Sequence, residues 1–267
     1  MFAPLRQIFR ARPTAPPSAV PAGTRYYAVG DIHGRSDLFD ALIAAIEEDD
    51  RNGGPAQTTV ILLGDLVDRG PDSAGVVARA RAWSDQREVV LLAGNHEEMF
   101  LNSFDDARVL RHFLRHGGRQ TVLSYGVPRS AYDEASLDEL QVLMRQYVPS
   151  VDRDYLSAAR NFLIAGDYVF VHAGILPDVA IEDQSPHHLR WIREQFLDHG
   201  DPHSHFVVHG HTITEGIDDQ ANRIGIDTGA YGSGRLTALV LEGTGRRTIQ
   251  AVELDGKIAI ETGTLTV

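Results

Sequence analysis

Aspartate, asparagine and histidine recur in five short segments, each of which follows an apolar run of the chain. Carboxylates, amides and imidazoles bind divalent cations, and carboxylates and imidazoles also transfer protons. A single Gly-Asp pair or a lone histidine is more often a turn or a satisfied polar residue, but packing alone hardly produces five such segments. They are Gly30-Asp31-Ile32-His33-Gly34, Gly64-Asp65-Leu66-Val67-Asp68-Arg69-Gly70, Gly94-Asn95-His96-Glu97, His172-Ala173-Gly174 and His209-Gly210-His211-Thr212.

The carboxylates of Asp31, Asp65 and Asp68 would repel one another strongly if the fold brought them together without counter-charge. Bound divalent cations remove that cost. The candidate ligands offer oxygen and nitrogen, and the chain contains no cysteine. This donor set suits Mn, Fe, Zn or Co without selecting one of them. The pattern therefore predicts a metal centre.

The apolar runs before the five segments are predicted to be buried strands, because they are short, rich in Val, Ile and Tyr, and bounded by glycine. Loops at the carboxyl ends of strands converge in open α/β sheets, so we expect the polar segments to meet. Further strands are predicted at 223–227, 235–242 and 247–254, the last of these being the final strand. The five runs cover 26–31, 59–65, 89–95, 168–174 and 206–211.

Helical patterns lie between the strands. An apolar stripe follows Ser36, and Ser136 with Glu139 has the spacing of a capping box. Alternation of strand and helix in the first hundred residues favours a largely parallel sheet, and the strand-rich tail favours a second sheet beside it. We therefore predict an α/β fold of two packed mixed β-sheets flanked by helices. Residues 97–165 form a mainly helical insertion.

The domain organisation follows from composition. Residues 1–23 are rich in proline and are expected to form a flexible arm, and residues 24–267 are expected to form one domain. The formal net charge of −12 disfavours a nucleic-acid partner. No apolar run is long enough for a membrane span, and no secretory signal is evident, so we expect a cytoplasmic protein.

The five segments together resemble the metallophosphoesterase (calcineurin-like) superfamily, and specifically its bacterial serine/threonine phosphoprotein-phosphatase-like branch. The matching motifs are GDIHG, GDLVDRG, GNHE, HAG and HGHT, and the resemblance extends over about 26–232. The strings at 64–73 and 117–126 look like small bacterial serine/threonine phosphatases. Symmetrical diadenosine tetraphosphatases are similar in the same motifs. The stretch 148–156 departs from the close relatives, because it has Asp152 and Arg153 where a histidine is expected.

The resemblance implies a centre of two divalent metal ions, with Mn²⁺ preferred and Fe, Zn, Co or Ni as alternatives. A hydroxide that bridges the two ions would attack phosphorus in line with the leaving group. Asp65 would bridge the ions. The first ion would be bound by Asp31, His33 and His211, and the second by Asn95, His172 and His209.

The resemblance also implies which residues contact the substrate. His96 would protonate the leaving group, and Asp68 would orient its imidazole. Arg69 would bind the phosphate together with Asn95 and His96. A second phosphate-binding arginine is expected in 188–197, where Arg193 is preferred over Arg190. Tyr231 and Asp227 are expected to line the site, with Asp227 supporting a ligand more than binding metal itself.

The expected activity is metal-dependent hydrolysis of phosphate esters, by a serine/threonine protein phosphatase or a small-molecule phosphomonoesterase. The substrate would be a phosphorylated protein or a small phosphate ester. A dinucleoside polyphosphate hydrolase, acting on diadenosine tetraphosphate, is the alternative. A non-catalytic metal-bound scaffold is a third hypothesis, which the presence of Asp65, Asp68 and His96 disfavours.

Overall fold

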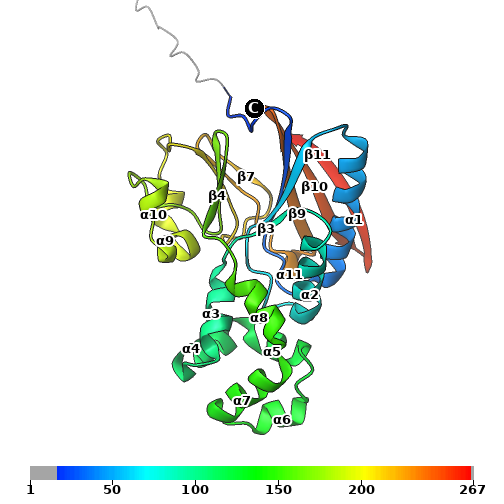
Figure 1. Ribbon diagram of the computed structural model, residues 1–267, viewed down its shortest axis with the longest axis vertical. Helices are drawn as coiled ribbons and strands as arrows, with labels where there is room; N and C mark the ends of the chain where they lie inside the picture. Colours follow the sequence, from blue (N-terminus) through cyan, green and yellow to red (C-terminus); the bar gives the residue numbers. More distant parts are fainter. Residues whose placement is uncertain (1–16, 266–267) are drawn as a thin grey trace, which may run out of the picture.

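Two β-sheets pack face to face in the computed structural model, which describes residues 17–265 (Figure 1). The first sheet has six strands in the order β11-β10-β9-β1-β2-β3, with β1, β2 and β3 parallel and the others antiparallel. Its strands are β1 (Thr24–Val29), β2 (Gln57–Leu62), β3 (Val89–Leu91), β9 (Arg235–Glu242), β10 (Gly245–Leu254) and β11 (Lys257–Leu265).

The second sheet has five strands in the order β4-β5-β6-β8-β7. The strands β5, β6 and β8 are parallel, and β4 and β7 pair antiparallel at the two edges. These strands are β4 (Phe162–Ala165), β5 (Tyr168–Val171), β6 (Phe206–His209), β7 (Asp218–Asp219) and β8 (Arg223–Gly225). The predicted fold of two mixed sheets is confirmed.

Two details of the sheet prediction are wrong. The tail does not all enter the second sheet, because β9, β10 and β11 extend the first sheet beside β1. The strand at 247–254 is not the last, since β11 follows it in a hairpin that pairs Leu254 with Lys257. Asp255 and Gly256 between them both have positive φ, 50° and 74°. An Asp-Gly pair with this geometry is typical of a two-residue hairpin turn.

Alternation along the strands of the first sheet divides its side chains between two cores. In β1, Tyr27 and Val29 face a core shared with the helices, whereas Ala28 faces the second sheet. The strands β2 and β9 alternate in the same way. The second core, between the sheets, contains Phe170 and Val208. Burial on both faces fixes the strand register, and with it the positions of the polar loops at the strand ends.

Helices cover the outer face of the first sheet and gather at one end of the sandwich (Figure 1). The helix α1 (Ser36–Asn52) buries the predicted apolar stripe of Leu38, Phe39, Leu42, Ile43 and Ile46. The helix α2 (Ser73–Ser84) packs into the same core. The elements η2 (Ile181–Asp183), α9 (Pro186–Trp191) and α10 (Glu194–Leu197) pack against the second sheet instead (Figure 1), and α11 (Ala230–Ser233) follows β8.

The segment expected to be a helical insertion is mainly helical, although it ends in β4 of the second sheet. Ser136 and Glu139 form the predicted capping box at the start of α7, with the Ser136 N–H donating to the glutamate at 2.8 Å. The elements are α3 (Asn95–Ser103), α4 (Ala107–Phe113), a kinked turn η1 (Leu114–Gly118), α5 (Arg119–Ser124), α6 (Arg129–Glu134), α7 (Leu137–Tyr147) and α8 (Ser150–Ser157).

The flexible arm predicted for residues 1–23 stays a prediction, and its first sixteen residues lie outside the described part. Ala19 donates its backbone N–H to Asp167, and Val20 donates to the carbonyl of Gly243. Val20 is buried against the second sheet. An apolar anchor and backbone hydrogen bonds thus hold this stretch on the domain. Over residues 17–265, we find no helix with the length and apolar character that a membrane crossing needs.

Candidate metal centre

The predicted polar segments meet at the carboxyl ends of β1, β2, β3, β5 and β6. Sharp turns after these strands aim the side chains inward. Seven non-glycine residues in the described part have positive φ, and five of them belong to these segments: His33, Asp65, Asp68, Arg69 and His211. Such conformations are strained and concentrate at functional sites. The positive φ angles of these residues are therefore associated with the site, and chain reversal alone does not explain them.

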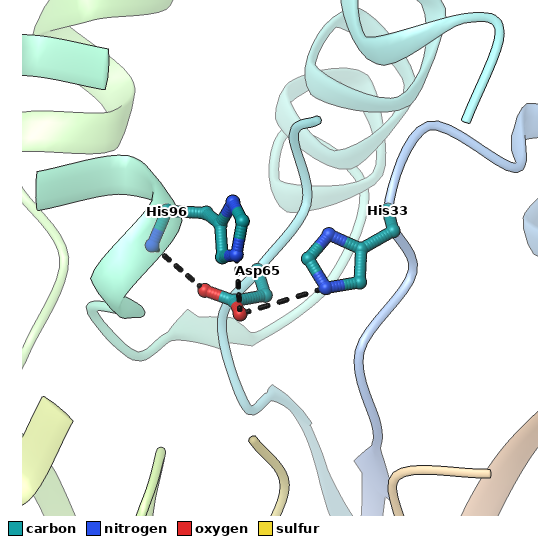
Figure 2. Close-up of side chains that lie close together, drawn as sticks. All are labelled: His33, Asp65 and His96. Atoms are coloured by element: carbon teal, nitrogen blue, oxygen red, sulfur yellow. Dashed lines mark hydrogen bonds and ion pairs between the residues drawn. The ribbon is translucent and has the colours of Figure 1, made fainter. Parts of the chain in front are cut away.

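Asp65 lies at the centre of the site (Figure 2). One of its carboxylate oxygens, Oδ2, lies 3.6 Å from His33 Nε2 and 3.9 Å from His96 Nε2. The other, Oδ1, lies 3.4 Å from His172 Nε2. Two groups with the geometry to bind a metal ion, His33-Asp65-His96 and Asp65-His172-His211, therefore share this one carboxylate. A shared carboxylate is the arrangement that a bridging ligand requires.

The imidazoles are held in the tautomer that a metal ligand needs. The Nδ1 atom of His33 lies 2.7 Å from the carbonyl of Val67, and that of His172 lies 2.8 Å from the carbonyl of Leu63. A carbonyl accepts only from an N–H, so Nδ1 of each ring carries a proton, and in the neutral ring the lone pair is on Nε2, which faces Asp65. Asn95 joins the same group, because its Oδ1 lies 3.0 Å from His172 Nε2.

Asp31 completes the acidic part of the site. Both of its carboxylate oxygens accept the backbone N–H of His211 at 3.1 Å, and one lies 4.0 Å from His33 Nε2. Burial, and then the negative charges of Asp227 and Asp65, raise the pKa of Asp31 well above its ordinary value. Gly210 leaves room for this contact, because a Cβ there would lie 2.2 Å from the Asp31 carboxylate.

This cluster contains buried polar atoms without hydrogen-bond partners, and such atoms could bind cations. The Nε2 of His211 and the Oδ2 of Asp227 are both buried and have no hydrogen-bond partner among the described residues. Burying three carboxylates, Asp31, Asp65 and Asp227, beside unpaired acceptors is costly without positive charge. Divalent ions supply that charge, and the donors present are the oxygen and nitrogen types that Mn, Fe, Zn or Co accept.

His209 is the residue for which the geometry differs from the predicted ligand set. Its Nδ1 lies 3.0 Å from the Gly210 carbonyl and its Nε2 lies 3.5 Å from the Arg223 guanidinium, beside Phe196. Within residues 17–265, neither metal-competent group includes it. The expectation that His209 and His211 both face the metals assumed an extended segment. The chain instead turns at His211, where φ is 64°, so only His211 joins Asp65 and His172.

The His96 imidazole is paired with a buried carboxylate. Its Nδ1 lies 2.6 Å from Asp68 Oδ2, and the other oxygen of Asp68 accepts the Thr121 hydroxyl at 2.6 Å. Burial acts to lower the pKa of His96, but the carboxylates of Asp65 and Asp68 outweigh it and raise that pKa. Thr121, from α5, is a contributor that the sequence reasoning missed.

Arg69 lies across the two imidazoles on the substrate side. Its guanidinium nitrogens lie 2.9 Å from His33 Nε2 and 3.0 Å from His96 Nε2. It also lies 5.0 Å over the ring of Tyr231, which is 41% exposed and meets His33 edge-on. Gly117 packs against its backbone, since a Cβ there would lie 2.6 Å from the Arg69 nitrogen. The geometry brings Arg69 and Tyr231 to the mouth of the site.

The two candidate arginines of 188–197 have different surroundings. Arg190 is paired with Glu98 at 2.9 Å and also donates to Asn161. Arg193 is exposed and donates to the Thr212 hydroxyl at 3.2 Å, one residue from His211. Arg193 therefore has a free guanidinium edge near the metal groups, which favours it over Arg190.

Glu97 is a second residue whose role the sequence reasoning missed, although it stands in the GNHE motif. Its carboxylate accepts the backbone N–H groups of Asp65 and Leu66 at 2.8 Å and that of Gly94 at 3.1 Å. It thereby joins the loop after β2 to the start of α3. Burial beside Asp65 raises the pKa of Glu97 to about 7. The four-letter motif is the only signal that could have identified it.

The sandwich fold and the shared carboxylate define a protein of the metal-dependent hydrolase class. The family model of the calcineurin-like phosphoesterases matches residues 24–228, most of the chain. This chain belongs to the calcineurin-like metallophosphoesterase family.

Two of the similar proteins differ in the activity that their names give. The symmetrical bis(5'-nucleosyl)-tetraphosphatase of Acidovorax ebreus is 32% identical over 157 residues, which cover 59% of this chain and 46% of the relative. The match thus spans about half of that relative's length. Serine/threonine-protein phosphatase 1 of Salmonella typhimurium is 28% identical over 220 residues, covering 79% of this chain and 89% of the relative.

Solved structures support the fold. A candidate diadenosine tetraphosphatase is 22% identical with a TM-score of 0.55, and covers 92% of this chain and 98% of its own. The cold-active protein-tyrosine phosphatase of a psychrophilic Shewanella is 17% identical with a TM-score of 0.53, and covers 92% and 82%. At these identities, the likeness concerns the fold alone.

Proposed function

We propose that this protein hydrolyses phosphate esters or anhydrides at a centre of two divalent metal ions. The observation that carries the proposal is the buried Asp65 carboxylate, which faces imidazoles on both sides and belongs to both metal-competent groups. No other carboxylate in the described part has this position. The proposed ligands are Asp31, His33, Asp65, Asn95, His172 and His211.

Two bound ions would polarise the phosphoryl group and lower the pKa of a water molecule between them. The protein's own side chains complete the chemistry. Arg69 and Arg193 orient the phosphate oxygens, with Tyr231 closing one side. His96 gives its proton to the leaving oxygen, and Asp68 stabilises the imidazolium and holds the ring in place.

The proposed substrate is a phosphorylated protein or a small phosphate ester. The Salmonella relative, matched over most of its length, supports phosphoserine or phosphothreonine as the reacting group. A second candidate is a dinucleoside polyphosphate, which the Acidovorax relative supports. The non-catalytic scaffold stays the weakest hypothesis, because the shared carboxylate and the His96–Asp68 pair are both intact. Mn²⁺ preference and a cytoplasmic location stay predictions.

A substrate panel tests the proposal. The purified chain is assayed for metal content and then, with Mn²⁺, on a phosphoserine peptide, an aryl phosphate and diadenosine tetraphosphate. We expect two ions per chain and turnover of at least one substrate. The Asp65→Asn variant is the matched control, and it should lose both metal and activity. Failure to turn over any phosphate ester with Mn²⁺, Co²⁺ or Ni²⁺ would reject the proposal.

A further inference from the structure

A line of exposed basic side chains runs along α4 and η1, and none of them belongs to the candidate metal centre. Residues 107–132 contain no aspartate or glutamate, although the whole chain has 37 of them and a formal net charge of −12. The basic residues follow the spacing i, i+3, i+4, i+7 and i+8, which gathers side chains on one side of a helix. Five exposed residues form this basic face: Arg108, Arg111, His112, Arg115 and His116.

The opposite side of the same segment is apolar and fixes its orientation. Leu110 and Phe113 are buried in the core that the helices share with the first sheet, and Leu114 packs against that core. The ring centroids of His112 and His116 lie 4.1 Å apart. The basic face therefore continues from α4 into the kinked turn η1.

The carboxyl end of the basic face lies beside the loop that carries Arg69. The carbonyl of Gly117, the residue after His116, accepts the backbone N–H of Arg69 at 3.2 Å. The helix α5 follows directly, and its Thr121 hydroxyl donates to the Asp68 carboxylate at 2.6 Å. These contacts hold η1 against the loop that is proposed to bind the substrate phosphate.

Two arginines of the basic face have charges that no carboxylate compensates. Arg108 is paired with Asp106 at 2.9 Å, whereas Arg111 and Arg115 form no ion pair among residues 17–265. They are four residues apart, about 6 Å along a helix axis. Alternate side chains of an extended peptide are about 6.6 Å apart, so carboxylates at alternate positions would meet both arginines.

The charges around His112 connect the basic face to the site. Burial, and then the positive charges of His116, Arg115 and His96, lower the pKa of His112. His112 therefore adds little charge at neutral pH, and the arginines supply the positive potential. The effect of His96 on this pKa also means that His112 is within electrostatic reach of the proposed proton donor.

We propose that the basic face binds an acidic stretch of a phosphoprotein substrate, a few residues from the phosphorylated side chain. The proposal rests on the proposed function and names a feature of its substrate. A small phosphate ester has no chain that extends to the face. A nucleic acid would meet repulsion from the net negative charge of the protein. An acidic peptide matches both the charge of the face and the spacing of Arg111 and Arg115.

Two phosphoserine peptides of equal length test the proposal, one with glutamate and one with glutamine at the flanking positions. On the Mn²⁺-loaded protein at low salt, we expect kcat/KM to be about tenfold higher for the glutamate peptide, because opposite charges speed association. This preference should shrink in about 0.5 M NaCl, where charges are screened. Arg111→Glu and Arg115→Glu should each reduce it to below about threefold.

Arg51→Glu is the matched control, because it makes the same change of charge at an exposed position. Arg51 is in the last turn of α1, a helix of 17 residues whose first turn follows the Gly30–Gly34 segment of the site. At about 1.5 Å per residue, the length of the helix separates Arg51 from that segment. The control should keep the preference for the glutamate peptide.

Fluorescence anisotropy with labelled forms of the two peptides measures binding without turnover. The glutamate peptide should bind more tightly, and only the variants of the basic face should weaken it. Equal affinities for the two peptides would overturn the proposal, as would equal effects of Arg51→Glu and Arg115→Glu. Loss of diadenosine tetraphosphate turnover with an unchanged peptide preference would also overturn it, by assigning the face to a phosphate chain. Absence of all ester turnover in the unmodified protein would instead reject the proposed function, while the binding comparison still decides the basic face.

Discussion

At the scale of single residues, the short contact between His96 and Asp68 favours a role for His96 in proton donation over a role in metal binding. His96 lies near Asp65 as well, so its imidazole could serve either purpose. Its Nδ1 is occupied by the Asp68 carboxylate at 2.6 Å, and its Nε2 faces Arg69 at the substrate side. The Asp68 contact leaves Nε2 as the ring atom that would carry a proton to a leaving group.

We predict that His96→Asn keeps both metal ions but slows hydrolysis of alkyl phosphates by about 10²- to 10⁴-fold. The loss should be much smaller for an aryl phosphate, because a phenolate leaves without a proton. Steady-state rates on both substrates, with metal analysis of the variant, check this. Equal losses on the two substrates would show that His96 is not the acid.

The two histidines of the HGHT motif provide a second residue-level prediction. His211→Ala should reduce the metal content below two ions per chain, because its unpartnered Nε2 belongs to the group with Asp65 and His172. His209→Asn should keep both ions, since its ring faces Arg223 and Phe196. Elemental analysis of the two purified variants decides, and the reverse pattern would restore His209 as the ligand.

At the scale of elements, α5 of the helical segment connects to the catalytic loop after β2 through one side chain. The hydroxyl of Thr121 lies 2.6 Å from the Asp68 carboxylate and 2.9 Å from its backbone N–H. Ser73, at the start of α2, joins the same buried cluster. These contacts fix Asp68 although its φ of 75° is unfavourable.

We therefore predict that Thr121→Val lowers the free energy of unfolding by about 1–3 kcal/mol, because it leaves buried polar groups unpaired. The rate on alkyl phosphates should fall by about tenfold through misorientation of His96, with a smaller fall on aryl phosphates. Thr121→Ser, which keeps the hydroxyl, is the control. Denaturant unfolding and both assays measure the effect, and an unchanged ratio of the two rates would assign Thr121 a structural role only.

At the scale of the whole molecule, the candidate metal centre lies where both sheets end. Its proposed ligands follow β1, β2 and β3 of one sheet and β5 and β6 of the other. Asp31, Asp65 and Asp227 are each at most 2% exposed. Without cations, their mutual repulsion opposes the packing of the two sheets. Metal binding should therefore stabilise the entire fold and not only the loops.

We predict that chelation lowers the melting temperature in a single cooperative transition and that Mn²⁺ restores it. An ion present at about 100 times its Kd contributes about 2.7 kcal/mol when only the folded state binds it. Differential scanning calorimetry of the treated and reloaded protein measures the shift. The Asp65→Asn variant should show little response to chelator, and a wild-type melting temperature independent of metal would contradict the prediction.

The sequence by itself determined the candidate residues of the site and the class of fold. Strand-end segments such as Gly30-Asp31-Ile32-His33 can be identified from the sequence, because a strand rich in Val and Ile followed by metal-binding residue types is a local pattern. The stripe of α1 and the capping box of α7 are local for the same reason and are confirmed. Strand pairing is not local, so the assignment of β9 to β11 to the first sheet could not be deduced.

Only the tertiary structure places His211, and not His209, beside Asp65 and His172, since the chain turns at His211, where φ is 64°. It also decided that Thr121 and Glu97 hold the catalytic loops. Their partners, Asp68 for Thr121 and Asp65 for Glu97, are distant in sequence, and hydrogen bonds between remote segments form only when the chain has folded. The residue types in the sequence indicate what chemistry is available, whereas packing in the folded chain sets the direction in which each side chain points.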